Sequence, residues 1–275
     1  MTKINKPSSL LLAVLVGISV VITISILGFI IAYILIRGIP NISLDLFEWK
    51  YTSDNVSMLP AVINTLIMIV ISLLIAVPVG VFSAIFLSEY AKRGNKLVTL
   101  IRVTAETLTG IPSIVYGLFG MLFFVTGLHL NLSLLSGALT LSIMVLPVIM
   151  RTTEEALLAV SDTYREGSYG LGAGRVRTIF RIVLPSAVPG IFSGIILSVG
   201  RIVGETAALI YTAGTVTNTV TGLLDSGRTL AVHMYCLSSE GLHMNESYAT
   251  AAVLLILVLL INMGSSKLAR LLMKQ

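Results

Sequence analysis

The most informative part of the sequence is SDTYREGSYGLGAGRVRTIFRIVLP, which runs from Ser161 to Pro185. It predicts a helix capped by Ser161, a tight turn, and a second helix that Pro185 ends. The glycines that permit the turn are Gly170, Gly172 and Gly174. The second helix carries apolar residues at helical spacing, with Arg175, Arg177 and Arg181 beside them: Val176, Ile179, Phe180 and Val183. A compact helical hairpin of this kind suits docking onto another protein, although a simple amphipathic connector would show the same periodicity.

Long apolar stretches lie on both sides of this hairpin. Of the 275 residues, 56% are hydrophobic and 11% charged, whereas a soluble domain carries about 25% charged residues. A spanning helix needs roughly 20 apolar residues, and lipid admits only helices or closed barrels. Continuous apolar runs without alternation therefore predict an all-α, polytopic membrane protein with six transmembrane helices. The expected spans are Leu10–Ile36, Leu59–Leu87, Leu97–Thr126, Leu132–Met150, Ala187–Tyr211 and Tyr248–Ser266.

The basic residues are concentrated in alternate connections. Of the 18 lysines and arginines, 14 lie in the termini, between spans two and three or, as Arg102, just beyond that loop, or in the connection that holds the hairpin. The exceptions are Arg37, Lys50, Arg201 and Arg228. The side that holds the 14 basic residues is predicted to be cytoplasmic, with both termini inside. Because Lys3 and Lys6 precede a long apolar run without a small-residue cleavage site, the first span is predicted to be a retained helix and not a signal peptide.

Several function classes are disfavoured by what the sequence lacks. The net charge of +5 is modest and is better explained as a topology signal than as nucleic-acid binding. The single cysteine, Cys236, excludes an intrachain disulfide and a cysteine-rich metal cluster, and the histidines show no metal-ligand spacing. Neither a G-x-x-x-x-G-K-[ST] loop nor an H-E-x-x-H motif occurs. We expect no catalytic residues, metal or cofactor in this chain.

The fifth span contains two charged residues, Arg201 and Glu205. A charge at the bilayer centre costs about 2.5–3.5 kcal/mol on insertion scales, so such a residue indicates function by default. Four residues apart on a helix, the two are expected to pair, and Gly190, Gly194 and Ser198 fall on the same face. Because an arginine offers a planar fork of donors to an oxyanion, this face could line an anion pathway. A buried ion pair that locks helix packing is the alternative, and the two are compatible.

Other polar residues are weaker candidates. Asn64 and Thr65 in the second span are expected to form interhelical hydrogen bonds. Arg102 and Glu106 are expected to pair within the third span, near its cytoplasmic end. The outer segments 37–58 and 212–247 could receive an external partner or could be ordinary solvated loops.

The hairpin resembles the EAA loop of ABC importer permeases. Gly172, nine residues, then Ile182, Val183, Leu184 and Pro185 match the spacing of that loop, and Glu166 takes its first position, although Gly167 and Ser168 replace two alanines. The resemblance implies that segment 151–187 forms the coupling helix that docks in a groove of a separate ATPase subunit. The residues it assigns to coupling are Glu166, Gly172, Ala173, Ile182, Leu184 and Pro185. A self-contained channel or carrier would not need such a hairpin.

Three further stretches resemble PstA-type phosphate permeases, over most of the chain from about Pro60 to Tyr211. They are Gly110–Gly120 (GIPSIVYGLFG), Arg151–Ala156 (RTTEEA) and Arg201–Ala207 (RIVGETA). The resemblance implies a MetI-like permease domain at 59–275, preceded by an additional helix and outer loop at 1–58, in a bacterial or archaeal cell membrane. It also implies transport of phosphate along a pathway that includes Arg201, Glu205, Ser198 and Thr206. Sulfate or molybdate is the alternative substrate.

The same resemblance implies an assembly. Its expected partners are a second permease of PstC type, two ATP-binding subunits of PstB type and an extracytoplasmic phosphate-binding protein of PstS type.

Overall fold

The computed structural model describes residues 7–91 and 94–272, and every regular element in that part of the chain is helical. Five basic residues that the sequence placed on the cytoplasmic side lie outside the described residues: Lys3, Lys6, Lys92, Arg93 and Lys274. The α-helices are α1 (Pro7–Gly38), α2 (Leu59–Ile85), α3 (Lys96–Thr109), α4 (Ser113–Gly120), α5 (Leu134–Leu158), α6 (Asp162–Gly170), α7 (Arg175–Thr178), α8 (Leu184–Val203), α9 (Ala207–Thr212), α10 (Leu230–Glu240) and α11 (Met244–Leu272). The remaining elements are two 3₁₀ turns, η1 (Ile39–Asn41) and η2 (Leu44–Phe47), and three π-helical turns, η3 (Phe86–Tyr90), η4 (Met121–Gly127) and η5 (Ile179–Val183).

Among the described residues, five helical segments are long and apolar enough to cross a membrane: Leu11–Asn41, Leu59–Tyr90, Leu134–Leu158, Arg175–Val203 and Met244–Lys267. A sixth crossing requires α3 and the α4–η4 segment together, and these are bent by 103° at their junction. The expected third span is therefore two helices joined by a sharp bend at the glycine and proline of Gly110–Ser113. Gly110, Ile111 and Pro112 separate the two helices, since proline brings no amide donor and restricts the residue before it.

The fifth span also differs from the prediction at both of its ends. Pro185 does not end the hairpin's second helix, because α7, η5 and α8 are continuous from Arg175 to Val203. The π-helical turn η5 immediately precedes this proline, and such local adjustments re-satisfy the backbone groups that a proline frees in a membrane helix. At the other end, Gly204 terminates α8, and the chain restarts as the short helix α9 at Ala207.

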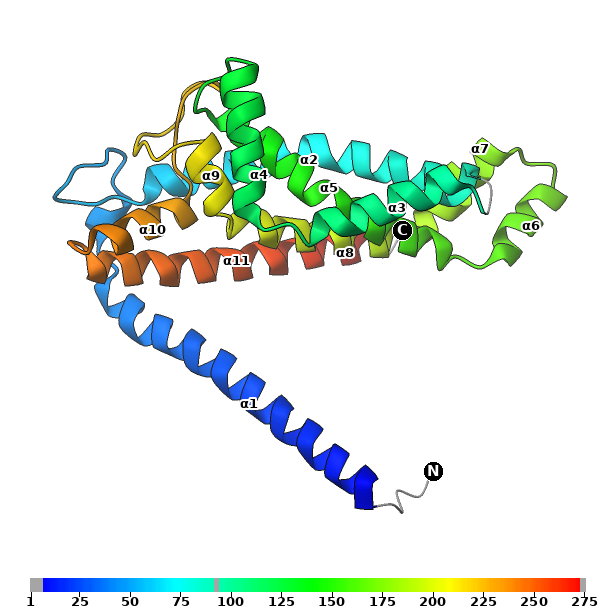
Figure 1. Ribbon diagram of the computed structural model, residues 1–275, viewed down its shortest axis with the longest axis horizontal. Coiled ribbons are helices and arrows are strands. Elements are labelled where there is room, and N and C mark those ends of the chain that lie inside the picture. The colour runs from blue at the N-terminus through cyan, green and yellow to red at the C-terminus, as the bar shows by residue number, and fades with distance from the viewer. Residues whose placement is uncertain (1–6, 92–93, 273–275) are drawn as a thin grey trace.

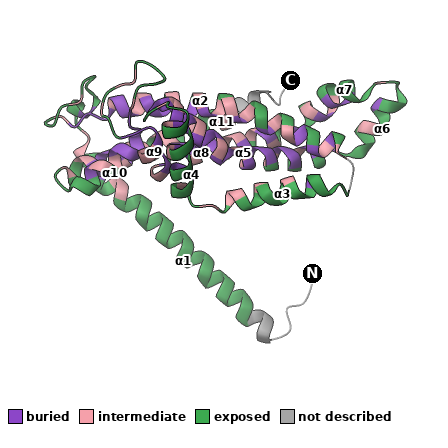
Figure 2. Ribbon diagram, turned by 45° about the horizontal axis from the view of Figure 1, so that its top comes forward, coloured by how far each residue is buried: buried purple, intermediate pink, exposed green. Residues whose placement is uncertain are grey.

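The core of the bundle lies where α2, α5 and α8 meet. Large apolar side chains fill it, among them Met68, Leu141, Met144, Ile149 and Ile202, and Figure 2 shows buried residues along α5. A Cβ added at Gly80 would lie 2.8 Å from Cγ2 of Ile149, so α2 and α5 approach closely there. The Ser142 hydroxyl donates to the Ser72 carbonyl at 3.1 Å. Small residues and polar contacts of this kind hold helices together in lipid.

The outer segments are partly ordered and buried. Thr65 accepts a hydrogen bond from the Leu230 amide of α10 at 2.8 Å, which confirms its expected interhelical role. Asn64 instead binds the segment that leads into α10, because its amide group contacts the carbonyl oxygens of Asn218 and Arg228. The 212–247 segment is therefore not an ordinary solvated loop.

Helix α1 runs away from the rest of the bundle (Figure 1). It touches α11 near its own C-terminal end, where a Cβ added at Gly38 would collide with Tyr248 and Ala252. The Tyr33 and Tyr248 hydroxyls are 3.4 Å apart there. Most of α1 is apolar and exposed (Figure 2), as expected of a surface that the bilayer or another membrane chain would cover.

Candidate functional site

The predicted hairpin forms at one end of the molecule, opposite α10 (Figure 1). The Ser161 hydroxyl accepts a hydrogen bond from the Thr163 amide at 3.3 Å, which confirms the predicted N-cap of α6. In the turn, Gly172 has a φ of +83°, whereas Gly174 has an ordinary φ of −76°. Only glycine adopts a left-handed backbone readily, so the turn depends on Gly172.

The hairpin presents apolar side chains to its surroundings. Leu171 at its tip is 91% exposed, and Val176 and Phe180 are exposed as well. Ile179 and Val183, the other half of the predicted apolar set, are fully buried against α2 and α5. Among the residues assigned to coupling, Glu166, Gly172 and Pro185 are exposed, and Ala173, Ile182 and Leu184 are half-buried.

A buried ion pair fixes the base of the hairpin. Arg165 donates to the Glu89 carboxylate at 2.7 Å and to the carbonyl oxygens of Val160 and Leu157 at 2.7 and 2.9 Å. The hydrogen bond with Glu89 raises the pKa of Arg165. Arg175 donates to the Glu89 carbonyl and lies 4.8 Å from the centre of the Tyr90 ring. Sequence reasoning missed Glu89, whose signal was a lone carboxylate at the end of an apolar span.

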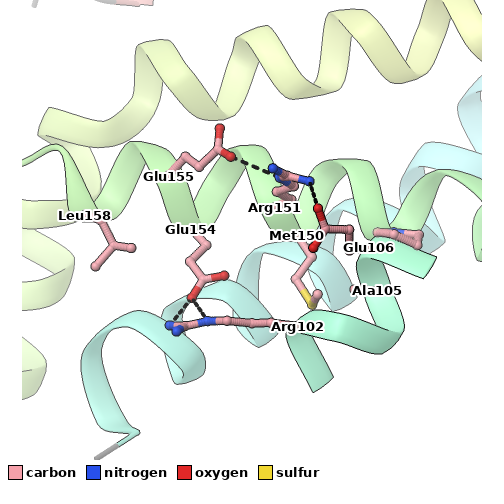
Figure 3. Close-up of a pocket in the computed structure, with 9 residues that line it drawn as sticks. Arg102, Ala105, Glu106, Met150, Arg151, Glu154, Glu155 and Leu158 are labelled. Carbon is pink, nitrogen blue, oxygen red and sulfur yellow. Dashed lines mark hydrogen bonds and ion pairs between the residues drawn. The ribbon is translucent and has the colours of Figure 1, made fainter. Parts of the chain in front are cut away.

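The predicted Arg102–Glu106 pair within α3 is wrong, because both residues pair with α5 instead (Figure 3). Nε of Arg102 donates to Glu154 at 2.8 Å, and Glu106 accepts from Arg151 at 3.4 Å. Arg151 also reaches Glu155 at 3.1 Å. An exposed pair on one helix contributes little, whereas the nearly buried Glu154 carboxylate needs a cation. These charges line a cleft of about 300 Å³ between α3 and α5.

The first part of the polar, small-residue face of α8, which holds Gly190, Gly194 and Ser198, packs inside the bundle. Gly190 and Gly194 pack against Ala156 and Thr152 of α5, where a Cβ at either position would collide. Ser198 is fully buried, and its hydroxyl donates to the Gly194 carbonyl at 2.9 Å. This part of the face packs helices together, as the alternative interpretation predicted.

Arg201 and Glu205 do not form the predicted ion pair. Helix α8 ends at Val203, so the helical geometry that would bring them together does not reach Glu205. The buried Glu205 carboxylate instead accepts a hydrogen bond from the Ala208 amide at 3.0 Å, at the start of α9. Thr206 is the half-buried N-cap residue of α9, and its hydroxyl lies 3.5 Å from the Gly204 carbonyl.

Arg201 is half-buried and makes no hydrogen bond or ion pair with any described residue. It lines a cleft of about 590 Å³ between α5, α8 and α11, together with Ser193, Gly200 and Asn262. The Oδ1 atom of Asn262 is buried without a partner. Sequence reasoning missed Ser193 and Asn262, although an amide inside the apolar run of the last span was a usable signal. An unpaired guanidinium can hold an oxyanion, and the free Oδ1 atom of Asn262 can accept a hydrogen bond from a protonated oxygen of that anion.

Two of the stretches singled out in the sequence meet in space. Helix α4, which carries SIVYGLFG, packs on α9, which begins at Ala207, the last residue of RIVGETA; a Cβ at Gly117 would lie 3.2 Å from the Ala207 carbonyl oxygen and 2.8 Å from Cα of Ala208. Gly120 approaches Thr212 in the same way. The Tyr116 hydroxyl donates across the bend to the Leu108 carbonyl of α3 at 2.8 Å. The glycines thus allow α4 to pack closely on α9. The Glu205 carboxylate caps the first turn of α9.

Solved structures define the class of this fold. The chain superimposes on a permease of the bacterial alginate ABC transporter, solved in complex with an alginate pentasaccharide-bound periplasmic protein, with a TM-score of 0.68. The sequences are 17% identical, and the match covers 98% of this chain and 96% of that one. The predicted fold of an ABC importer permease is confirmed.

Residues 76–274 match the family of inner membrane components of binding-protein-dependent transport systems, and the chain belongs to that family. It is a multi-pass permease subunit of an ABC importer in the inner membrane, and it is not the catalytic part of that importer.

Two proteins of similar sequence are named as permeases. The probable ABC transporter permease protein YqgI of Bacillus subtilis is 33% identical, over 94% of both chains. The phosphate transport system permease protein PstA 1 of Mycobacterium tuberculosis H37Rv is 42% identical over 154 residues. That match covers 56% of this chain and about half of the mycobacterial protein.

Proposed function

We propose that this chain is the PstA-type permease of a phosphate ABC importer and that it translocates inorganic phosphate into the cytoplasm. It pairs with a second permease of PstC type and is driven by two ATP-binding subunits of PstB type. An extracytoplasmic binding protein of PstS type delivers the phosphate. The hairpin and both chain termini face the cytoplasm, where Glu166, Gly172, Ala173, Ile182, Leu184 and Pro185 couple the permease to its ATPase.

The observation that carries this proposal is the unpaired Arg201. An arginine within a membrane span is costly and is retained where it contacts substrate, water or a counter-charge. Here the neighbouring Glu205 carboxylate is engaged with Ala208, which leaves the guanidinium available to a ligand. The planar fork of an arginine matches two oxygens of a phosphate, and Oδ1 of Asn262 in the same cleft can accept from a protonated phosphate oxygen. The likeness to named PstA permeases supports phosphate as that ligand.

Uptake of radiolabelled phosphate by cells that depend on this importer tests the role of Arg201. We expect Arg201→Ala to lower uptake by about ten- to a hundredfold, because a hydrogen bond to a charged group contributes about 1.5–3 kcal/mol. Arg201→Lys should restore only part of it, since a lysine lacks the fork. Arg37→Ala, at an exposed arginine outside the cleft, is the matched control. Normal uptake by Arg201→Ala, with the subunit present at wild-type abundance, would remove Arg201 from the pathway.

Sulfate or molybdate is the second candidate substrate, because each is an oxyanion that an arginine would also bind. Competition distinguishes them. Excess unlabelled phosphate should abolish labelled uptake, and excess sulfate or molybdate should leave it unchanged. Inhibition by sulfate or molybdate instead would assign the importer to that anion.

A further inference from the structure

A second unpaired arginine lies at the opposite end of the bundle from the hairpin. Arg228 precedes α10 and is only 4% exposed. Its guanidinium lies 4.8 Å from the centre of the Tyr51 ring, and its Nε and Nη2 atoms are buried without a hydrogen-bond partner. No carboxylate of the described residues lies within ion-pair distance of it. Burial of an uncompensated charge costs several kcal/mol, so this guanidinium requires an anion.

Two more buried polar side chains lie beside Arg228. Thr229 is the N-cap residue of α10, but its buried hydroxyl makes no capping hydrogen bond. His233 lies one turn further along and is fully buried; neither ring nitrogen meets the geometry of a hydrogen bond with a described residue, although the Val56 backbone lies close enough to act on its pKa as a hydrogen-bond partner. Its ring meets the same Tyr51 ring edge to face, with the centroids 6.2 Å apart. Arg228 and His233 therefore converge on Tyr51 at the amino end of an 11-residue helix.

The electrostatics of this cluster favour a negative ligand. Burial, and secondarily the charge of Arg228, lower the pKa of His233 to about 3. The imidazole is therefore neutral at physiological pH and carries one N–H donor without adding charge, for which the Val56 backbone competes with a ligand. The amino end of a helix carries a partial positive charge and attracts anions. A guanidinium, a hydroxyl, an imidazole and a helix terminus together form the kind of donor set that binds an oxyanion.

The cluster is held in place by α2. The Asn64 amide donates to the Arg228 carbonyl at 3.2 Å, and its Oδ1 atom accepts from the Val220 amide at 3.0 Å. Thr65 accepts from the Leu230 amide, the first of α10. Donors that are already positioned lose less entropy when a ligand binds. The three residues that supply these donors are buried, at 4%, 2% and 0% exposure, which favours a small anion over a carboxylate on the surface of another protein.

We propose that Arg228, Thr229 and His233 form an external anion site that receives a small oxyanion before it enters the membrane spans. Identification of that anion as phosphate rests on the proposed function, whereas the existence of the site does not. The site would be separate from Arg201 and would be occupied earlier in the transport cycle.

Hydrogen–deuterium exchange of the assembled importer tests the site, with the amides of residues 224–241 as the readout. Phosphate, sulfate and chloride are compared at constant ionic strength. At about ten times its dissociation constant, phosphate should slow exchange at the amino end of α10 by about tenfold, because a ligand suppresses local opening in that proportion. Arg228→Gln should abolish the effect, and Arg228→Lys should weaken it. Arg37→Gln, at an exposed arginine near the same end, should leave it unchanged.

Each other outcome has a definite meaning. If no anion slows exchange in the wild-type importer, or if Arg228→Gln keeps the full effect, the site does not exist. If exchange slows only when the external binding protein is added without anion, Arg228 contacts that protein and the anion site is refuted. Slowing by sulfate but not by phosphate would support the site and contradict the proposed phosphate transport. Persistence of the phosphate effect in Arg201→Ala would show that the two arginines bind separately.

Discussion

At the scale of single residues, the two charges of the RIVGETA stretch have different structural roles. Glu205 lies just beyond the end of α8 and caps the start of α9 through the Ala208 amide. Arg201 lies one turn earlier and faces the cleft with Asn262. A helix that ends between them therefore separates a structural carboxylate from an available guanidinium. The Glu205 carboxylate is four residues from Arg201 in the chain, so it can still act on the binding of an anion beside Arg201.

Replacement of Glu205 separates its cap from its charge. Glu205→Gln keeps one oxygen that can accept from the Ala208 amide but replaces the other carboxylate oxygen, which could accept from a protonated phosphate, by an amide donor. We therefore expect near-normal membrane abundance and phosphate uptake lowered by about tenfold. Glu205→Ala removes both and should also cost about 1 kcal/mol of stability, which lowers abundance. Uptake normalised to the amount of assembled importer is the measurement. If Glu205→Gln only reduces abundance, the residue acts in packing alone.

At the scale of elements, apolar length was enough to predict the spans but not their interruptions. The GIPS turn was recognisable from its glycine and proline, yet the 103° bend depends on how α4 packs on α9. Pro185 was expected to end a helix, as in water. In the bundle, a π-helical turn accommodates it, and α8 continues the hairpin directly. The partners of Arg102 and Glu106 could not be predicted, because they belong to α5, 45 or more residues away.

The turn of the hairpin permits a matched pair of substitutions. Gly172 has a φ of +83° and Gly170 does not, and an added Cβ would meet nothing within 4 Å at either position. Gly172→Val should distort the turn at a cost of about 1–3 kcal/mol, and we expect it to uncouple ATP hydrolysis from phosphate uptake. Gly170→Val should behave as wild type. Uptake and stimulated ATPase activity of the purified importer are the measurements, and full coupling in Gly172→Val would contradict the docking role of the hairpin.

At the scale of the whole molecule, the spans separate a hairpin end from an α10 end (Figure 1). With α3 and α4–η4 counted as one crossing, six crossings return the chain to the side on which it began. The arginines of the hairpin then lie on one side, with Arg37 and Arg228 on the other. The charge asymmetry of the sequence was enough to propose this orientation. The external cluster around Arg228 could not be predicted, since Tyr51 and His233 are 182 positions apart and only the fold brings them together.

Cysteine labelling tests the orientation. In a background with Cys236→Ser, cysteines at Leu171 and Leu44 serve as a matched pair, because these residues are 91% and 90% exposed at opposite ends. A membrane-impermeant maleimide should label Leu44→Cys, and not Leu171→Cys, on intact cells whose outer envelope is opened. Inside-out vesicles should show the reverse pattern. Labelling of Leu171→Cys from outside would invert the proposed topology.

The contacts of Glu89 with both hairpin helices have a mechanical consequence. Arg165 joins the first hairpin helix to the end of the α2 span, and Arg175 joins the second hairpin helix to the same residue. Both hairpin helices are thus bound to the same residue, and the second helix continues without interruption into α8. A displacement of the hairpin tip would therefore move the end of the α2 span and α8 together, because neither contact allows the hairpin to shift independently of them.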